Sequence, residues 1–180
     1  MSTWKSHGLR GSVFEDLINK TNEKYLEMGL ACVQKIPTPI TPVSMNEKKQ
    51  ITLAYFDQKS TVDYIGVVQG VPVCFDAKES KTDRFPLANI HEHQVSFMEN
   101  FEAQDGVSFF LIYYTHLDVM VYLPFDMFKF FWDRALEGGR KSFNFDEINP
   151  DYIIEQNRGV FVPYLEPLKK DIEERDLTHS

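Results

Sequence analysis

Asp63, Asp76 and Lys78 are residues whose types and spacing suit phosphodiester hydrolysis. Asp76 and Lys78 are two residues apart, so on a β-strand their side chains project to the same face. Carboxylate oxygens hold Mg²⁺, the metal activates a water, and an ammonium group stabilises the negative charge of the transition state. These residues therefore predict a Mg²⁺-dependent nuclease centre. A surface ion pair at a strand end is the alternative interpretation of the same residues.

A β-hairpin is expected to bring these side chains together. The runs 61–68 and 71–80 are rich in β-branched and apolar residues, and the pair Gln69-Gly70 separates them. Such a pair between two strands is typical of a tight hairpin turn. Asp63 then lies on the strand next to the one that carries Asp76, and can sit across from it.

A helix over residues 13–28 is the expected position of a third carboxylate, Glu15. Apolar residues recur at helical spacing in this segment, and Gly29 is a suitable stop. Ser12 followed by Glu15 three residues later has the pattern of a capping box. Glu15 is therefore either the capping acid or a metal ligand that reaches over from the first helical turn.

Residues 36–57 are expected to form a projecting arm of extended chain. Pro37, Pro39 and Pro42 exclude both a helix and a central strand. Lys48 and Lys49 make the tip of the arm basic. The alternative is a long surface loop, although an insertion of this length in a compact domain is often functional.

A second amphipathic helix is expected over residues 87–101. Gln94 falls in its apolar stripe, where an amide needs a buried partner. His91 and His93 are two residues apart and diverge on a helix, whereas a zinc-binding pair is spaced four apart. These histidines are therefore interpreted as structural or phosphate-facing.

The rest of the chain predicts a mixed α/β fold in one domain. A continuous apolar run over 107–114 is typical of a strand buried on both faces. The remaining expected elements are a strand over 119–123, a helix over 124–136, an irregular segment over 142–163 and a terminal helix over 167–177. Strands and helices in this order predict a mixed sheet flanked by helices, within a single domain of residues 1–180.

Composition limits the classes of partner. The net charge of −8 argues against a protein that coats nucleic acid non-specifically. The first 50 residues, however, carry a net charge of +2, which allows a local basic face. The chain has no apolar run long enough to cross a bilayer and no apolar signal core, so we expect a cytoplasmic protein without a membrane partner.

Cys32 and Cys74 lie in apolar runs and are expected to be buried free thiols.

Several motifs together resemble the RecU family of bacterial Holliday-junction resolvases, which belong to the PD-(D/E)xK nucleases. The motifs are Arg10-Gly11 with Glu15; Asn19-x-Thr21-Asn22; Lys35-x-Pro37-Thr38-Pro39-Ile40; Ala54-Tyr55-Phe56; Ser60-Thr61-x-Asp63-Tyr64-x-Gly66-Val67; Phe75-x-Ala77-Lys78-Glu79; Phe85-Pro86-Leu87-x-Asn89; and His91-x-His93-Gln94. The resemblance covers residues 10–136. It implies a restriction-endonuclease-like fold in which 36–57 is a stalk and 142–180 is a C-terminal extension.

The resemblance also implies a role for individual residues. Lys78 would be the catalytic lysine, acting with the carboxylates of Asp63, Asp76 and Glu15. The expected Mg²⁺ site, which Mn²⁺ would also fill, comprises Asp63, Asp76, Glu15, Thr61 and Gln94. The basic residues expected to contact DNA are Arg10, Lys35, Lys48, Lys49, Lys81 and Arg84.

The implied activity is paired strand cleavage of four-way junction DNA in recombination and repair. A homodimer would present two active sites to a two-fold symmetric junction. Recombination and branch-migration proteins are further implied partners. The family usually has Glu where this chain has Asp76, and two alternatives remain open: a duplex-cutting endonuclease of the same superfamily, and a non-catalytic module that binds branched DNA.

Overall fold

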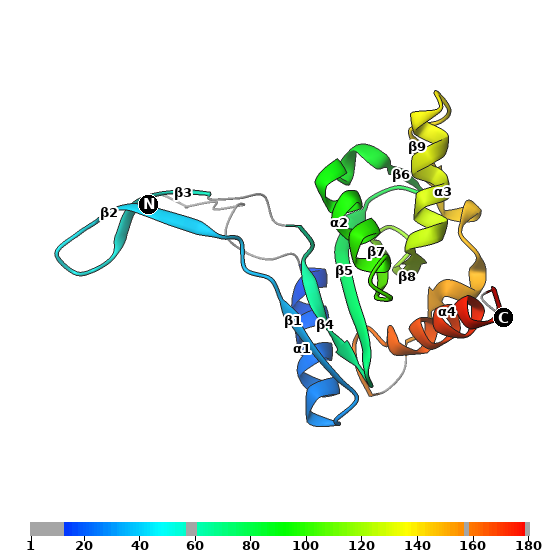
Figure 1. Ribbon diagram of the computed structural model, residues 1–180, viewed down its shortest axis with the longest axis horizontal. Coiled ribbons are helices and arrows are strands. Elements are labelled where there is room, and N and C mark those ends of the chain that lie inside the picture. The colour runs from blue at the N-terminus through cyan, green and yellow to red at the C-terminus, as the bar shows by residue number, and fades with distance from the viewer. Residues whose placement is uncertain (1–12, 57–60, 157–158, 179–180) are drawn as a thin grey trace.

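A six-stranded mixed sheet forms the centre of the part of the chain that the structure, a computed structural model, describes: residues 13–56, 61–156 and 159–178 (Figure 1). The strands in spatial order are β1 (Ala31–Lys35), β4 (Tyr64–Val68), β5 (Val71–Ser80), β7 (Val107–Tyr114), β8 (Val119–Pro124) and β10 (Ile153–Ile154). The helices are α1 (Val13–Glu27), α2 (Glu92–Glu102), α3 (Phe125–Leu136) and α4 (Leu165–Thr178). The expected mixed sheet flanked by helices is confirmed.

The hairpin of β4 and β5 has the expected turn. Gln69 and Gly70 both have positive φ angles, 47° and 96°, as a tight turn between twisted antiparallel strands requires. β5 then pairs in parallel with β7, which places Asp76 beside Phe110. Because β5 lies between β4 and β7, the residues at its centre are inside the protein on both sides of the strand.

Each face of the sheet has its own apolar core. Phe75, stacked on Tyr64 and Phe109 with ring centroids 4.7 Å apart in each pair, belongs to the core beneath α1 and α4. Cys74 and Phe110 point to the opposite face and belong to the core beneath α2 and α3. Because strand side chains alternate, Asp76 and Lys78 lie on the α2 side.

Within residues 36–56, β2 (Ile40–Met45) and β3 (Ile51–Phe56) form a separate two-stranded hairpin that projects from the sheet (Figure 1). Its register shifts around Pro42 and Ser44, where proline cannot donate a ladder hydrogen bond. At the base of the arm, the Ile36 amide donates to the Asp63 carbonyl oxygen at 2.7 Å. The arm is therefore joined directly to the segment that carries a predicted site residue.

The prediction of one helix over 87–101 is wrong in its first turn. Leu87–Asn89 form a short 3₁₀ helix, and α2 begins at Glu92 after two extended residues. The His91 side chain accepts a hydrogen bond from the backbone N–H of Gln94. The Gln94 side chain in turn accepts one from the backbone N–H of His91 at 3.1 Å. This reciprocal capping starts a new helix at this point.

The segment predicted to be irregular contains short strands. β9 (Ser142–Asn144) pairs with β6 (Arg84–Pro86), and β10 pairs with β8. Two further 3₁₀ turns, Phe145–Glu147 and Pro150–Tyr152, lie between β9 and β10. Strands of two or three residues are too short for a recognisable alternation of apolar and polar residues.

The prediction of buried cysteine thiols holds for Cys74, which is buried, and fails for Cys32, which is exposed on the edge strand β1.

The residues after β10 contribute to the core, because Tyr164 is completely buried and donates to Asn22 Oδ1 at 2.7 Å. The Thr21 hydroxyl accepts from the Val162 amide at 3.0 Å. Among the described residues, no helix is both long and apolar enough to span a membrane.

Gly66→Ala is expected to lower the free energy of unfolding by about 1–3 kcal/mol. A Cβ atom at Gly66 would lie 2.2 Å from the Cys32 carbonyl oxygen and 2.5 Å from Val33 Cα, so β1 would have to move away from β4. Val67→Ala, at the next and half-exposed position, is the control and is expected to change stability by about 0.5 kcal/mol or less. Urea unfolding measures both variants. An unchanged midpoint for Gly66→Ala would contradict the close approach of the two strands.

Candidate active site

β5 places a carboxylate and an ammonium group next to each other on the α2 side of the sheet. The Asp76 side chain is 0% exposed, and that of Lys78 is 21% exposed. Lys78 Nζ forms an ion pair with Asp76 Oδ2. Alternation along a single strand is sufficient to bring the two groups together, since residues two apart share a face.

Asp63, just before β4, lies against the same part of β5. Its Oδ2 accepts a hydrogen bond from the Ala77 amide at 3.0 Å. This bond holds the Asp63 carboxylate between the positions from which Asp76 and Lys78 project. The structure thus brings the three residues of the sequence-based hypothesis to one point, at the end of the β4–β5 hairpin far from its turn.

Gln94 on α2 has the buried partner that its place in an apolar stripe requires. Its Nε2 donates to Asp76 Oδ1 at 3.0 Å, and its Oε1 accepts from the His91 amide. The helix cap therefore orients the amide, and the amide orients the carboxylate. His91 has a structural role as the N-cap, with its ring stacked on that of His93 at a centroid distance of 5.3 Å.

Burial raises the pKa of the Asp76 carboxyl from its ordinary 3.8 to about 7. The Lys78 ammonium lowers this pKa, and the nearby Asp63 carboxylate raises it. The cost of desolvating the charge therefore exceeds the attraction of the single lysine. A divalent cation at this point would favour the ionised form strongly, because it adds two positive charges next to the carboxylates.

The chemistry of the donor set fits a hard divalent cation. Asp76 Oδ2 is buried and faces the Lys78 ammonium, with which it forms an ion pair. Asp63 supplies a second set of carboxylate oxygens. Such oxygens are the ligands that Mg²⁺ prefers, with water completing its shell. In the described ranges, however, no group of three or more acidic, histidine or cysteine side chains is gathered closely enough to hold a metal ion.

Glu15 lies on α1 and is held by another partner. Its carboxylate forms an ion pair with Lys35 Nζ, and its carbonyl oxygen lies 3.3 Å from the Tyr64 hydroxyl. A role for Glu15 as a metal ligand stays a prediction, and it requires release from Lys35. Thr61 is partly buried two residues before Asp63, and its role in the site also stays a prediction.

Comparison with known proteins shows to which family the chain belongs. The model of Recombination protein U, RecU, matches residues 9–170. The chain belongs to the RecU family. A Lactococcus lactis subsp. lactis protein named Holliday junction resolvase RecU is 42% identical over 170 residues, which cover 91% of this chain and 78% of the relative. The Bacillus subtilis protein of the same name is 40% identical over 148 residues, 79% of this chain and 71% of the relative.

Among solved structures, the chain is similar to Hjc, a Holliday junction resolvase of the archaeal hyperthermophile Archaeoglobus fulgidus. The TM-score is 0.39 with 7% identity, over 63% of this chain and 78% of Hjc. The resemblance to RecU that the motifs indicated is confirmed by the family match.

The basic residues predicted to contact DNA occupy three places. Lys48 and Lys49 are exposed in the turn at the tip of the arm, and Lys81 and Arg84 are exposed after β5, where Arg84 Nε donates to Ser142 Oγ at 2.8 Å. Lys35 is the last residue of β1, at the base of the arm, and is paired with Glu15. Arg10 lies outside the described residues.

Three residues that hold the site together were not predicted from the sequence to do so. The Tyr64 hydroxyl donates to Asn19 Oδ1 at 3.0 Å, which fixes α1 against the strand that follows Asp63. Glu79 Oε1 accepts from the Phe14 amide at 3.4 Å, at the first turn of α1. Tyr64, Asn19 and Glu79 all belong to the RecU family motifs, so their presence there was the available signal.

Asp76→Asn is expected to raise the melting temperature of the metal-free protein at alkaline pH. The folded-state pKa is raised, so the stability contributed by this group is fully present below about pH 4 and is lost as the pH rises through about 7. The amide cannot ionise, and we expect a gain of about 3–6 °C near pH 8.5 with little change near pH 4.5. Thermal unfolding in EDTA, followed by circular dichroism, measures the difference.

Asp146→Asn is the control for this pH dependence, because Asp146 is exposed on a 3₁₀ turn and is not part of the candidate site. Its melting temperature should equal that of the wild type at both pH values. A melting temperature of Asp76→Asn below that of the wild type at alkaline pH would contradict the inferred cost of the buried charge.

Proposed function

We propose that this chain is a Mg²⁺-dependent endonuclease that resolves Holliday junctions by paired strand cleavage. The observation that carries the proposal is the buried Asp76 carboxylate, which lies beside Asp63, Lys78 and Gln94 at the base of a projecting hairpin. Membership of a family whose relatives are named Holliday junction resolvases supports the same substrate.

In the proposed mechanism, the carboxylates of Asp63 and Asp76 hold the cation. When bound, Mg²⁺ lowers the pKa of a water and neutralises charge on the phosphate. Lys78 holds the attacking water in line with the phosphorus and stabilises the charge that develops on the phosphate oxygens. Gln94 keeps the Asp76 carboxylate in one orientation through its Oδ1, while Oδ2 faces Lys78.

The arm would supply selectivity for branched DNA. We assign residues 36–57 as a stalk on a single nuclease domain, with its lysine-bearing tip inside the open centre of a four-way junction. A homodimer with two-fold symmetry would then place one active site on each of two strands of like polarity. Recombination and branch-migration proteins would act on the same junction and are the expected protein partners.

A non-catalytic module that binds branched DNA is the second candidate. Two observations favour it: Asp76 is one methylene shorter than the glutamate usual in the family, and the net charge of −8 weakens affinity for phosphate. A duplex-cutting enzyme is the third, but it leaves the projecting hairpin without a role.

Asp63→Ala is expected to lower the rate of junction cleavage by roughly 100-fold or more, because it removes a metal ligand. The assay compares a labelled mobile four-way junction with a linear duplex of the same sequence, in Mg²⁺ and in EDTA. Asp146→Ala serves as the control, since that carboxylate is exposed and lies outside the site.

Paired nicks in the junction alone, which depend on Mg²⁺ and on Asp63, would support the resolvase. Equal cleavage of the linear duplex would identify a duplex-cutting enzyme. Tight junction binding without cleavage in Mg²⁺ or Mn²⁺ would identify a binding module and overturn the proposed activity.

The stalk tip is tested by removing its charge without straining its backbone. Lys49 has a positive φ of 59°, which asparagine tolerates better than alanine, so the variant combines Lys48→Ala with Lys49→Asn. Junction affinity should fall, and the slope of log affinity against log salt should decrease by about 1 for each lysine.

Lys169→Ala on α4 is the matched control, because Lys169 is 75% exposed and pairs with Glu173 at 3.7 Å. Its junction affinity should equal that of the wild type. If both tip lysines can be removed without any change in affinity or salt dependence, the stalk tip does not contact the junction phosphates.

A further inference from the structure

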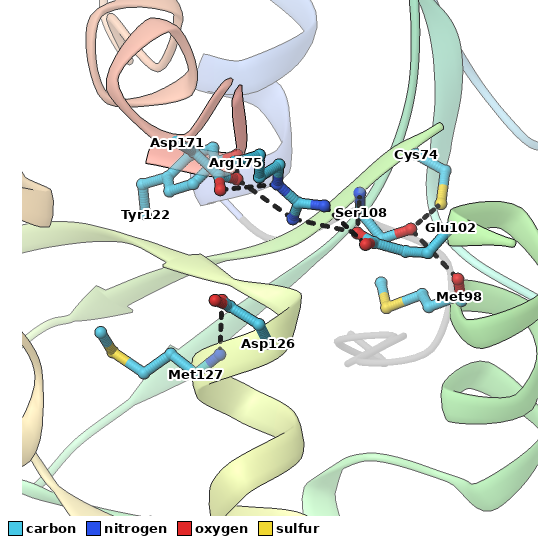
Figure 2. Close-up of polar contacts among 9 residues, drawn as sticks. All are labelled: Cys74, Met98, Glu102, Ser108, Tyr122, Asp126, Met127, Asp171 and Arg175. Carbon is cyan, nitrogen blue, oxygen red and sulfur yellow. Dashed lines mark hydrogen bonds and ion pairs between the residues drawn. The ribbon is translucent and has the colours of Figure 1, made fainter. Parts of the chain in front are cut away.

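A partly buried arginine joins the two helical layers of the protein. α4 packs on one face of the sheet and α2 on the other. Arg175 of α4 contacts Glu102, the last residue of α2, through two nitrogens: Nη1 to Oε2 at 2.6 Å and Nη2 to Oε1 at 3.1 Å (Figure 2). Its Nε also donates to Asp171 Oδ1 at 2.8 Å, and Asp171 in turn accepts from the buried Tyr122 hydroxyl at 2.6 Å.

The contacts continue from Glu102 to the strand that carries the site. Glu102 Oε1 also accepts from the Ser108 amide at 2.7 Å, where β7 begins. The Ser108 hydroxyl lies 3.2 Å from Cys74 Sγ on β5 and donates to the Met98 carbonyl oxygen of α2 at 3.4 Å (Figure 2). Cys74 is two residues before Asp76 on the same strand. We call Arg175, Asp171, Glu102, Ser108 and Tyr122 the Arg175 network.

Helix α2 therefore has a polar anchor at each end. Near its first turn, Gln94 donates to Asp76 Oδ1; at its last residue, Glu102 is held by Arg175. The helix has 11 residues and spans about 16 Å. A short helix moves as a rigid body, so an adjustment at one end changes the position of the side chains at the other.

We propose that Arg175 is a positioning residue for the metal site: by holding the C-terminal end of α2, it fixes the orientation in which Gln94 presents the Asp76 carboxylate. The inference rests on the proposed function. The match to the family model ends at residue 170, so it includes neither Asp171 nor Arg175.

The chemistry of the network explains why arginine is required. A guanidinium group is planar and can bond both oxygens of one carboxylate while Nε bonds another, which a lysine ammonium cannot do in a fixed geometry. Loss of Arg175 leaves Glu102 and Asp171, whose side chains are 21% and 3% exposed, without their cation. Each carboxylate then moves toward solvent or takes up a proton, and the end of α2 moves with Glu102.

The expected effect is a weaker response to Mg²⁺. Groups that orient a metal ligand typically affect metal affinity about 10–100-fold, and a group that acts through such an orienting residue should lie at the lower end. We therefore expect Arg175→Met to raise the Mg²⁺ concentration for half-maximal effect about tenfold. Arg175→Lys and Glu102→Gln, which disturb the network less, should give smaller changes in the same direction.

The test measures Mg²⁺ in two ways, by the thermal shift of the protein without DNA and by the rate of junction cleavage. All variants are compared at a temperature at which circular dichroism shows them folded. Lys170→Met is the matched control: Lys170 lies on the same helix and pairs with Asp151 and Glu174, but none of these residues is in α2. It should alter stability without changing the Mg²⁺ midpoint.

A double-mutant cycle distinguishes positioning from general destabilisation. If Arg175 acts through Gln94, Arg175→Met should change the Mg²⁺ midpoint of the wild type about tenfold, but that of the Gln94→Leu variant by less than about twofold. An equal change in both backgrounds, or no change in the wild type, would overturn the inference. A wild type that binds no Mg²⁺ and cuts no junction would instead overturn the proposed function, on which the inference depends.

Discussion

The structure depends on keeping a carboxylate inside a β-sheet. Asp76 is completely buried in the central strand, and burial raises its pKa to about 7 even though Lys78 lies beside it. Such a group is costly in the metal-free state, and it is tolerated because Gln94 donates to one oxygen and an ammonium group faces the other. The elements around β5 supply these partners: the hairpin brings Asp63, the capping box of α2 brings Gln94, and α1 is bonded to Tyr64 next to Asp63.

The parts of the fold that follow from the sequence are those with a strong local pattern. The β4–β5 hairpin was predictable because Gln69-Gly70 can adopt positive φ angles, and the buried β7 because its apolar run is continuous. The break before α2 was missed, because His91 and Gln94 fit the sequence pattern of a continuing helix. Their reciprocal capping bonds become apparent only in the structure. β9 and β10 were missed because their pairing partners lie far away in the chain and their own patterns are two or three residues long.

In the site too, features set by neighbouring residues were predictable, and features set by the packing of distant segments were not. Strand alternation predicts that Asp76 and Lys78 share a face, and an amide in an apolar stripe predicts that Gln94 has a buried partner. The identity of that partner depends on how α2 packs on β5, which no local pattern contains. The ion pair of Glu15 with Lys35 was unpredictable for the same reason, and so was the Arg175 network, whose members come from α2, β7, β8 and α4.

The turn between β4 and β5 has a consequence for how the family can vary in length. Surface turns usually tolerate insertions, but side chains on a strand alternate with a period of two residues. One extra residue at Gln69-Gly70 that shifted the register of β5 would rotate Asp76 into the core beneath α1 and turn Ala77 toward α2. The turn at the tip of the stalk has no such constraint, because no residue of the proposed metal site follows it in the same hairpin. Evolutionary changes in length should therefore accumulate at the stalk and be excluded from the shorter turn.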